Sequence, residues 1–100
     1  MNSLEKHLIF IREFCTIHKV KSLFVFGSVT TDKYDEKSDV DLLVEFEDIE
    51  PLEYATHYFE LKFLLQDLLN KPIDLLENSA LKNVFLKEEI DKTKVLIYGK

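Results

Sequence analysis

The hydrophobic positions of this 100-residue chain change their spacing several times, and each change predicts a new element. In the first segment, apolar residues recur every three or four positions, which is the period of an amphipathic helix. This pattern predicts a helix over 3–17. Its expected core stripe is Leu4, Leu8, Ile11 and Cys15, widened by Phe10, Phe14 and Ile17.

Three short apolar runs predict strands. The run 22–27 is rich in Phe and Val and stops at a glycine, and the run 39–46 continues from two aspartates into Val, Leu and Phe. The third run, 71–77, carries Pro72 at its beginning, where a missing N–H is tolerated. The polar segment 30–38 between the first two runs is either a loop or a short surface helix.

The remaining apolar patterns are helical. A long helix is expected over 52–69, with Pro51 suited to its first position, and a second over 79–91. The segment 94–99 is either a last strand or a helical end. This order of elements predicts an α+β (α/β) fold, a small mixed β-sheet flanked by helices, in one domain over 1–100.

Composition and charge narrow the function classes. The formal net charge is −6, Arg12 is the only arginine, and the lysines are scattered among acids, so direct nucleic-acid binding is not expected. The single cysteine, Cys15, excludes an intrachain disulfide and favours a reducing compartment. No apolar run approaches the ~20 residues of a membrane span. We therefore expect a soluble, cytoplasmic protein that binds no membrane.

The other metal-ligating and nucleophilic side chains give no site by their spacing. His7, His18 and His57 have no metal-binding spacing with the cysteine or with each other, so solvated positions on helix surfaces are expected for them. Cys15 lies on the apolar stripe of the first helix and is expected in the core.

Two aspartates at the start of an apolar strand suggest a metal site. Strand side chains alternate between faces, so Asp39 and Asp41 project together, about 7 Å apart along the strand. Their charges repel, and a divalent cation such as Mg²⁺, with free positions for phosphate oxygens, relieves that repulsion. The alternative is that both aspartates are solvated caps at the exposed start of the strand, which is the commoner case for an isolated D-x-D.

Two further features of the sequence favour a metal site over solvated caps. Gly27 and Ser28 end the preceding strand, and a glycine followed by a serine can either cradle phosphates or form a simple turn. If the two strands are neighbours, this turn lies at the same end of the sheet as the aspartates. Asp74 is a lone charge between Ile73 and Leu75, either paired with a lysine such as Lys71 or placed beside the metal pair as ligand and general base.

These elements together resemble the nucleotidyltransferase superfamily to which DNA polymerase beta belongs. The shared pattern is G-S, ten residues, D-x-D, an apolar strand, a long helix and a lone aspartate in a third strand. At this length, the sequence "GS…SDVDLLVEF" is similar to the minimal nucleotidyltransferase (MNT) group. The resemblance covers nearly the whole chain.

The resemblance implies a nucleotidyltransferase site and a partner. In that family three carboxylates hold Mg²⁺ and the phosphates of a nucleotide such as ATP, so Asp39, Asp41 and Asp74 would be the catalytic, metal-binding residues, and Gly27 and Ser28 would cradle the triphosphate. MNT proteins are commonly antitoxins paired with a HEPN-type ribonuclease toxin, and some transfer AMP to a tyrosine of that toxin. The resemblance therefore implies a protein adenylyltransferase that acts as an antitoxin.

The sequence departs from the family at one point. Many members carry an arginine soon after the serine, in patterns like G-S-x-A-R-G, whereas Ser28 is followed here by Val-Thr-Thr-Asp. Lys33 and Lys37 are the nearby cations that could face the phosphates instead.

Two other functions stay open at this point. One is a binding module that neutralises the toxin by contact alone, and the other is nucleotide transfer to a small molecule. Tyr54, Tyr58 and Leu61 of the long helix are candidates for a surface that docks a partner protein. The acidic residues near that helix in sequence would attract a basic partner: Glu45, Glu47, Asp48, Glu50 and Glu53. With such a partner the chain would form a hetero-oligomer, and a homo-oligomer stays open as well.

Overall fold

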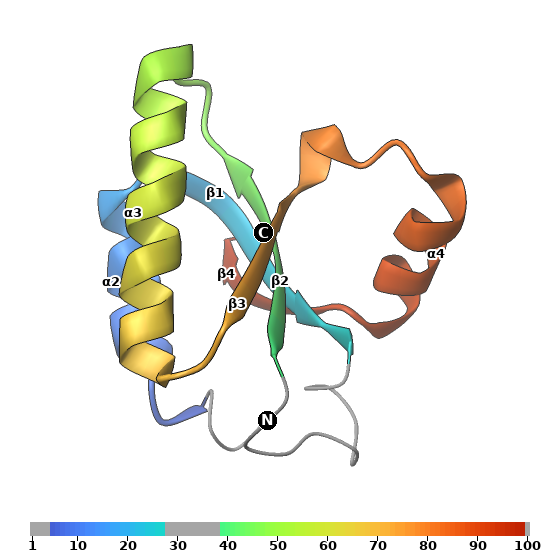
Figure 1. Cartoon of the computed structure of the whole chain (residues 1–100), viewed down its shortest axis with the longest axis horizontal. Coiled ribbons are helices and arrows are strands. Elements are labelled where there is room, and N and C mark those ends of the chain that lie inside the picture. The colour runs from blue at the N-terminus through green and yellow to red at the C-terminus, as the bar shows by residue number, and fades with distance from the viewer. Residues whose placement is uncertain (1–4, 28–38, 100) are drawn as a thin grey trace.

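A computed structural model of the chain describes residues 5–27 and 39–99. Its helices and strands are, in chain order, α2 (Leu8–Ile17), β1 (Val20–Phe26), β2 (Val40–Phe46), α3 (Pro51–Leu69), β3 (Ile73–Glu77), the short 3₁₀ helix η2 (Asn78–Ala80), α4 (Val84–Thr93) and β4 (Val95–Gly99). The predicted α+β class, with a small mixed sheet and flanking helices, is confirmed (Figure 1).

The strands of the described chain form one four-stranded sheet in the order β3-β2-β1-β4. β1 pairs antiparallel with both β2 and β4, whereas β2 and β3 are parallel. A parallel pair needs a long crossover, and α3 supplies it. The segment left open by the sequence, 94–99, is the edge strand β4.

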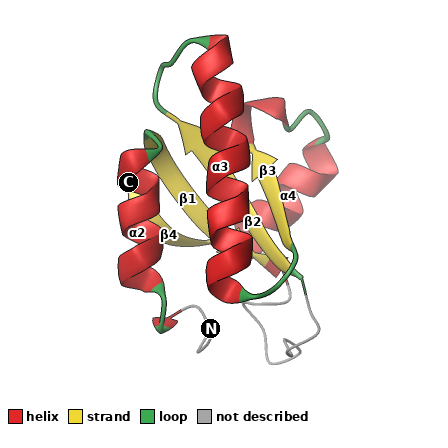
Figure 2. Ribbon diagram, turned by 60° about the vertical axis from the view of Figure 1, so that its left-hand side comes forward, coloured by secondary structure: helices red, strands yellow, loops and turns green. Residues whose placement is uncertain are grey.

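Helices cover the two faces of the sheet unequally. Figure 2 shows α2 and α3 side by side across one face, while α4 lies behind the sheet. Because strand side chains alternate, every second residue of β2 points under α2 and α3. The larger core forms there, and its fully buried members include Ile11, Cys15, Leu23, Val25, Val40, Leu42, Val44, Leu61 and Leu65.

The opposite face carries a much smaller core. Phe26, Leu43 and Ile90 are buried there against α4. The rest of α4 packs poorly, since Val84 and Phe85 are 65% and 81% exposed. One face of the sheet is thus closed, and the other stays partly accessible to solvent.

Local chemistry explains where the helices begin and end. α3 starts with Pro51 in its first turn and stops at Asn70, which adopts a left-handed conformation with φ 53°. The Asn83 side chain caps α4, because its Oδ1 accepts hydrogen bonds from the backbone N–H groups of Phe85 and Leu86 at 3.0 and 3.1 Å. The predicted helix 79–91 is therefore divided into η2 and a later α4.

The predicted partner-docking surface on α3 is wrong in one residue. Leu61 is fully buried, because it lies one helical turn from Leu65 on the stripe that faces the sheet. Tyr54 and Tyr58 are half-buried and pack against the same core. The large apolar side chains that α3 does expose include Leu52, Phe59 and Phe63.

The first helix also buries less than its pattern predicted. Ile11 and Cys15 are buried as expected, whereas Phe10 and Ile17 are 51% and 65% exposed. The helix contacts the sheet along its narrow stripe only. No described helix has the length and apolar character that crossing a membrane requires.

A pair of substitutions on α3 tests this assignment. Leu61→Ala should lower the free energy of unfolding by roughly 2–5 kcal/mol, because it leaves a cavity in the main core. Phe63→Ala, half a turn away and 64% exposed, should change it by less than about 0.5 kcal/mol. Urea denaturation followed by circular dichroism measures both, and equal losses in the two variants would contradict the packing described here.

Candidate functional site

The register between β2 and β3 brings two of the predicted carboxylates together. In this parallel pair Asp41 is aligned with Asp74, so both side chains project from the same face of the sheet. Their neighbours Val40 and Ile73 are also aligned, and both are buried on the opposite face. Asp39 precedes β2 by one residue and acts electrostatically on Asp41. The three aspartates therefore lie at one end of the sheet.

The end of β1 approaches the same place. Phe26 is the antiparallel partner of Asp41, so Gly27 follows directly beside that carboxylate. Gly27 has φ +76°, and a Cβ built on it would lie 2.6 Å from Oδ2 of Asp41. A side chain at this position would displace the carboxylate, and only glycine fits without strain. Ser28 lies outside the described residues.

The surroundings of Asp41 disfavour its negative charge. Burial raises the pKa of its carboxyl group, and the charges of Asp74 and Asp39 raise it further. Asp41 is half-buried, whereas Asp39 and Asp74 are exposed on the edge of the site. An all-oxygen donor set with mutual repulsion suits a hard divalent cation such as Mg²⁺, which reverses the electrostatic penalty.

The aspartates do not form a closed ligand cluster. Within residues 5–27 and 39–99, the three side chains whose ligand atoms all lie within 4.8 Å of one another are His18, His57 and Glu60. In this structure Asp39, Asp41 and Asp74 therefore share one end of the sheet without converging on a single point.

Tyr58 contributes to this site in a way that the sequence did not indicate. Its hydroxyl donates a hydrogen bond to the carbonyl oxygen of Leu75 at 2.5 Å, one residue after Asp74. Burial raises the pKa of the Tyr58 hydroxyl, and the Asp74 charge adds to the effect. The bond ties edge strand β3 to α3 and so holds Asp74 in position. Tyr58 and Leu75 are 17 positions apart in the chain, so no local sequence pattern predicts this hydrogen bond.

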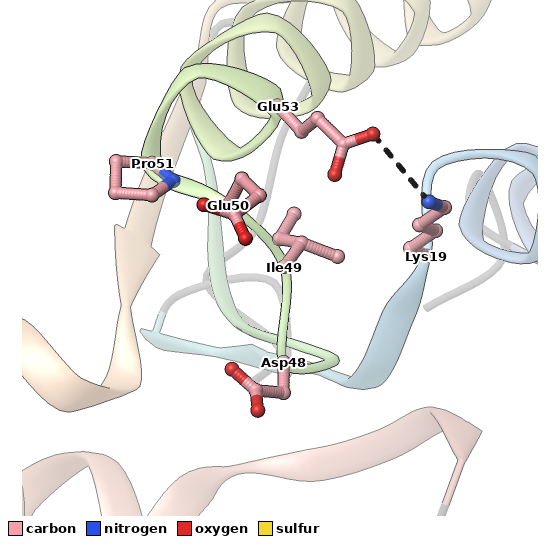
Figure 3. Close-up of a pocket in the computed structure, with 6 residues that line it drawn as sticks. All are labelled: Lys19, Asp48, Ile49, Glu50, Pro51 and Glu53. Atoms are coloured by element: carbon pink, nitrogen blue, oxygen red, sulfur yellow. Dashed lines mark ion pairs between the residues drawn. The ribbon is translucent and has the colours of Figure 1, made fainter.

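Three of the five acidic residues that the sequence places near α3 line a separate pocket. Figure 3 shows Asp48, Glu50 and Glu53 lining it with Lys19, whose Nζ lies 3.8 Å from Oε1 of Glu53. The pocket follows the end of β2, whereas Asp41 is near the beginning of that strand. At about 3.3 Å per residue, the five residues from Asp41 to Phe46 span roughly 17 Å. This pocket is not part of the aspartate site.

One expectation about the histidines is wrong. His18 is only 6% exposed, and its Nδ1 lies 2.9 Å from Nδ1 of His57. Sequence spacing missed the pair because the two residues are 39 positions apart and meet only where α2 and α3 pack. The expectation for Cys15 is confirmed, since it is fully buried and burial raises the pKa of its thiol to about 12.

Comparison with known proteins agrees with this architecture. Residues 9–97 match the family model described as a nucleotidyltransferase domain. A candidate protein adenylyltransferase of Methanocaldococcus jannaschii is 38% identical over 94 residues, which are 94% of this chain and 90% of that protein.

Solved structures show the same fold. A candidate minimal nucleotidyltransferase superimposes with a TM-score of 0.77 at 29% identity, covering 94% of this chain and 92% of the other. A chain from the complex of tri-AMPylated Shewanella oneidensis HEPN toxin with MNT antitoxin superimposes with a TM-score of 0.67 at 17% identity, covering 96% and 72%.

The raised pKa of Asp41 leads to a prediction about stability. Between the ordinary aspartate pKa and the raised one, the folded state binds more protons than the unfolded state, so stability falls as pH rises through that window. Asp41→Asn should therefore stabilise the protein at pH 7, by on the order of 0.5 kcal/mol because solvent screens the half-exposed charge. Thermal denaturation with and without Mg²⁺ measures this.

The same experiment has an internal control. Mg²⁺ should raise the melting temperature of the natural sequence and have little effect on Asp41→Asn. A destabilised Asp41→Asn variant without Mg²⁺, or equal stabilisation of both proteins by Mg²⁺, would contradict the assigned electrostatics.

Proposed function

This chain belongs to the nucleotidyltransferase domain family, and on that basis we propose that it transfers AMP from ATP to a tyrosine hydroxyl of a HEPN-type ribonuclease toxin and so neutralises it. The observation that carries the proposal is the site geometry. Asp41 is aligned with Asp74 across a parallel strand pair, and Gly27 is packed against the Asp41 carboxylate.

The three carboxylates have distinct roles in this proposal. Asp39 and Asp41 would hold Mg²⁺, and Asp74 would complete the oxygen ligand set. When bound, Mg²⁺ neutralises charge on the nucleotide phosphates and offers free coordination positions to their oxygens. The rigid β2–β3 pair keeps Asp41 and Asp74 aligned before any ligand arrives, and this positioning is what such transfers require of a protein.

Asp74 is also placed to act as the general base. It is exposed and lies on the edge strand β3, so a hydroxyl of a partner protein can reach it. It accepts the hydroxyl proton while the hydroxyl oxygen forms a bond to the α-phosphorus of ATP. The bond between the α- and β-phosphates breaks, and pyrophosphate leaves with its electron pair. AMP is then attached to the partner through a phosphodiester bond.

Gly27 and Ser28 position the phosphates in this proposal. The glycine lacks a side chain that would keep a phosphate away from its backbone. The serine hydroxyl and neighbouring N–H groups offer donors to phosphate oxygens. Lys33 and Lys37, proposed to supply the missing cation, lie with Ser28 outside the described residues.

A HEPN-type partner is supported by similarity and by the surface. One structural neighbour is named as an MNT antitoxin in complex with an AMPylated HEPN toxin. In this chain, α3 exposes Phe59 and Phe63, at 55% and 64%, which are suited to a protein interface. The acidic pocket at the start of α3 would attract a basic partner surface.

The test is the intact mass of the protein encoded by the neighbouring gene, after incubation with this chain, ATP and Mg²⁺. The partner should gain one or more AMP units, and peptide mapping should place them on tyrosine. The double variant Asp39→Asn/Asp41→Asn should lose at least about 10³-fold in rate while still folding, because charge stabilisation of the phosphates is removed. Circular dichroism checks its fold.

The outcome also separates the competing function. An unchanged partner mass together with a tight complex, retained by the double variant, would show a binding module that neutralises by contact alone. AMP on a residue other than tyrosine would overturn only the assigned acceptor.

A further inference from the structure

A second group of ligand-type side chains lies on the helix-covered side of the sheet, where α2 and α3 pack side by side (Figure 2). His18 directly follows α2 as its C-cap, and its backbone N–H donates to the Phe14 carbonyl at 2.9 Å. His57 and Glu60 are three residues apart on α3, so they share one helix face. The helix packing directs all three side chains to one point.

The ligand atoms of this group converge closely. His18 Nδ1 lies 2.9 Å from His57 Nδ1 and 3.6 Å from Oε2 of Glu60, and all three ligand atoms lie within 4.8 Å of one another. Two imidazole nitrogens bound tetrahedrally to Zn²⁺, at about 2.0–2.1 Å each, are separated by about 3.3 Å. The distance of 2.9 Å between the two Nδ1 atoms would therefore have to increase by only a few tenths of an ångström.

We propose that His18, His57 and Glu60 form a Zn²⁺ site that joins α2 to α3, separate from the aspartate site. Two imidazoles and one carboxylate are a donor set that zinc uses in proteins, with a fourth position left for water. His18 is buried, His57 is half-buried and Glu60 is exposed, so the fourth position faces solvent. Mg²⁺ and Ca²⁺ prefer oxygen donors and do not compete well here.

Metal binding would change the contact between the two rings. In the metal-free pair one Nδ1–H donates to the other Nδ1. Coordination through both Nδ1 atoms would require the donor ring to adopt its other tautomer, with the proton on Nε2. The hydrogen bond and the metal are therefore alternative ways of joining the two rings.

Equilibrium dialysis against Zn²⁺ tests the proposal. The untagged chain with Asp39→Asn/Asp41→Asn serves as the parent, because two of the three carboxylates of the other site then cannot bind zinc. It should take up one Zn²⁺ per chain, and Co²⁺ should give the visible absorption of a four-coordinate site. Adding His57→Asn or Glu60→Gln should weaken zinc binding by at least tenfold, since each removes a ligand.

Glu53→Gln is the matched control, since Glu53 is a glutamate of the same helix that pairs with Lys19 instead. It should keep the parent affinity. Zinc at roughly 100-fold above its dissociation constant should raise the melting temperature of the parent by on the order of 10 °C. His57→Asn and Glu60→Gln should lose this shift.

Nitrogen NMR of the imidazole rings gives a second, independent reading. Zinc should shift the Nδ1 signals of His18 and His57 and leave His7, the third histidine, unchanged. No zinc uptake at micromolar concentration, or uptake that His57→Asn and Glu60→Gln retain unchanged, would overturn the site. The contact between His18 and His57 would then be a hydrogen bond only.

Discussion

The hydrogen-bonded register of β2 is the constraint on which the candidate active site depends. Pairing with the antiparallel strand β1 places Gly27 beside Asp41. Pairing with the parallel strand β3 aligns Asp74 with Asp41. Strand side chains have a period of two, so a slip of one residue would turn Asp41 toward the core. The buried side chains Val40 and Leu42 on the other face prevent such a slip, because they would become exposed to water.

The two faces of the sheet differ in how completely helices cover them. α2 and α3 close one face over a continuous apolar core, which supplies most of the buried hydrophobic surface. The other face is covered by α4 through a small cluster, formed by Phe26 of β1, Leu43 of β2 and Ile90 of α4. That incomplete cover keeps Asp39 and Asp74 in water, where their charges cost little. A fully covered sheet would have had to bury three like charges.

Ionisable side chains gather at separate places in the described structure. The aspartates lie at the beginning of β2, and the acidic pocket with Lys19 and Glu53 follows its end. The His18–His57 contact joins the helices on the closed face, away from the aspartates. This contact adds a directional polar interaction to the apolar packing between α2 and α3.

The sequence by itself determined what local periodicity can carry. The period of two placed Asp39 and Asp41 on one face, the period of 3.6 placed Cys15 and Ile11 in the core, and Gly27 marked the end of a strand. It did not determine that Asp74 aligns with Asp41, that Leu61 faces the sheet rather than a partner, or that His18 meets His57. These contacts depend on strand pairing and helix packing between segments that are distant in the chain. The spacing of residues along the chain therefore does not predict them.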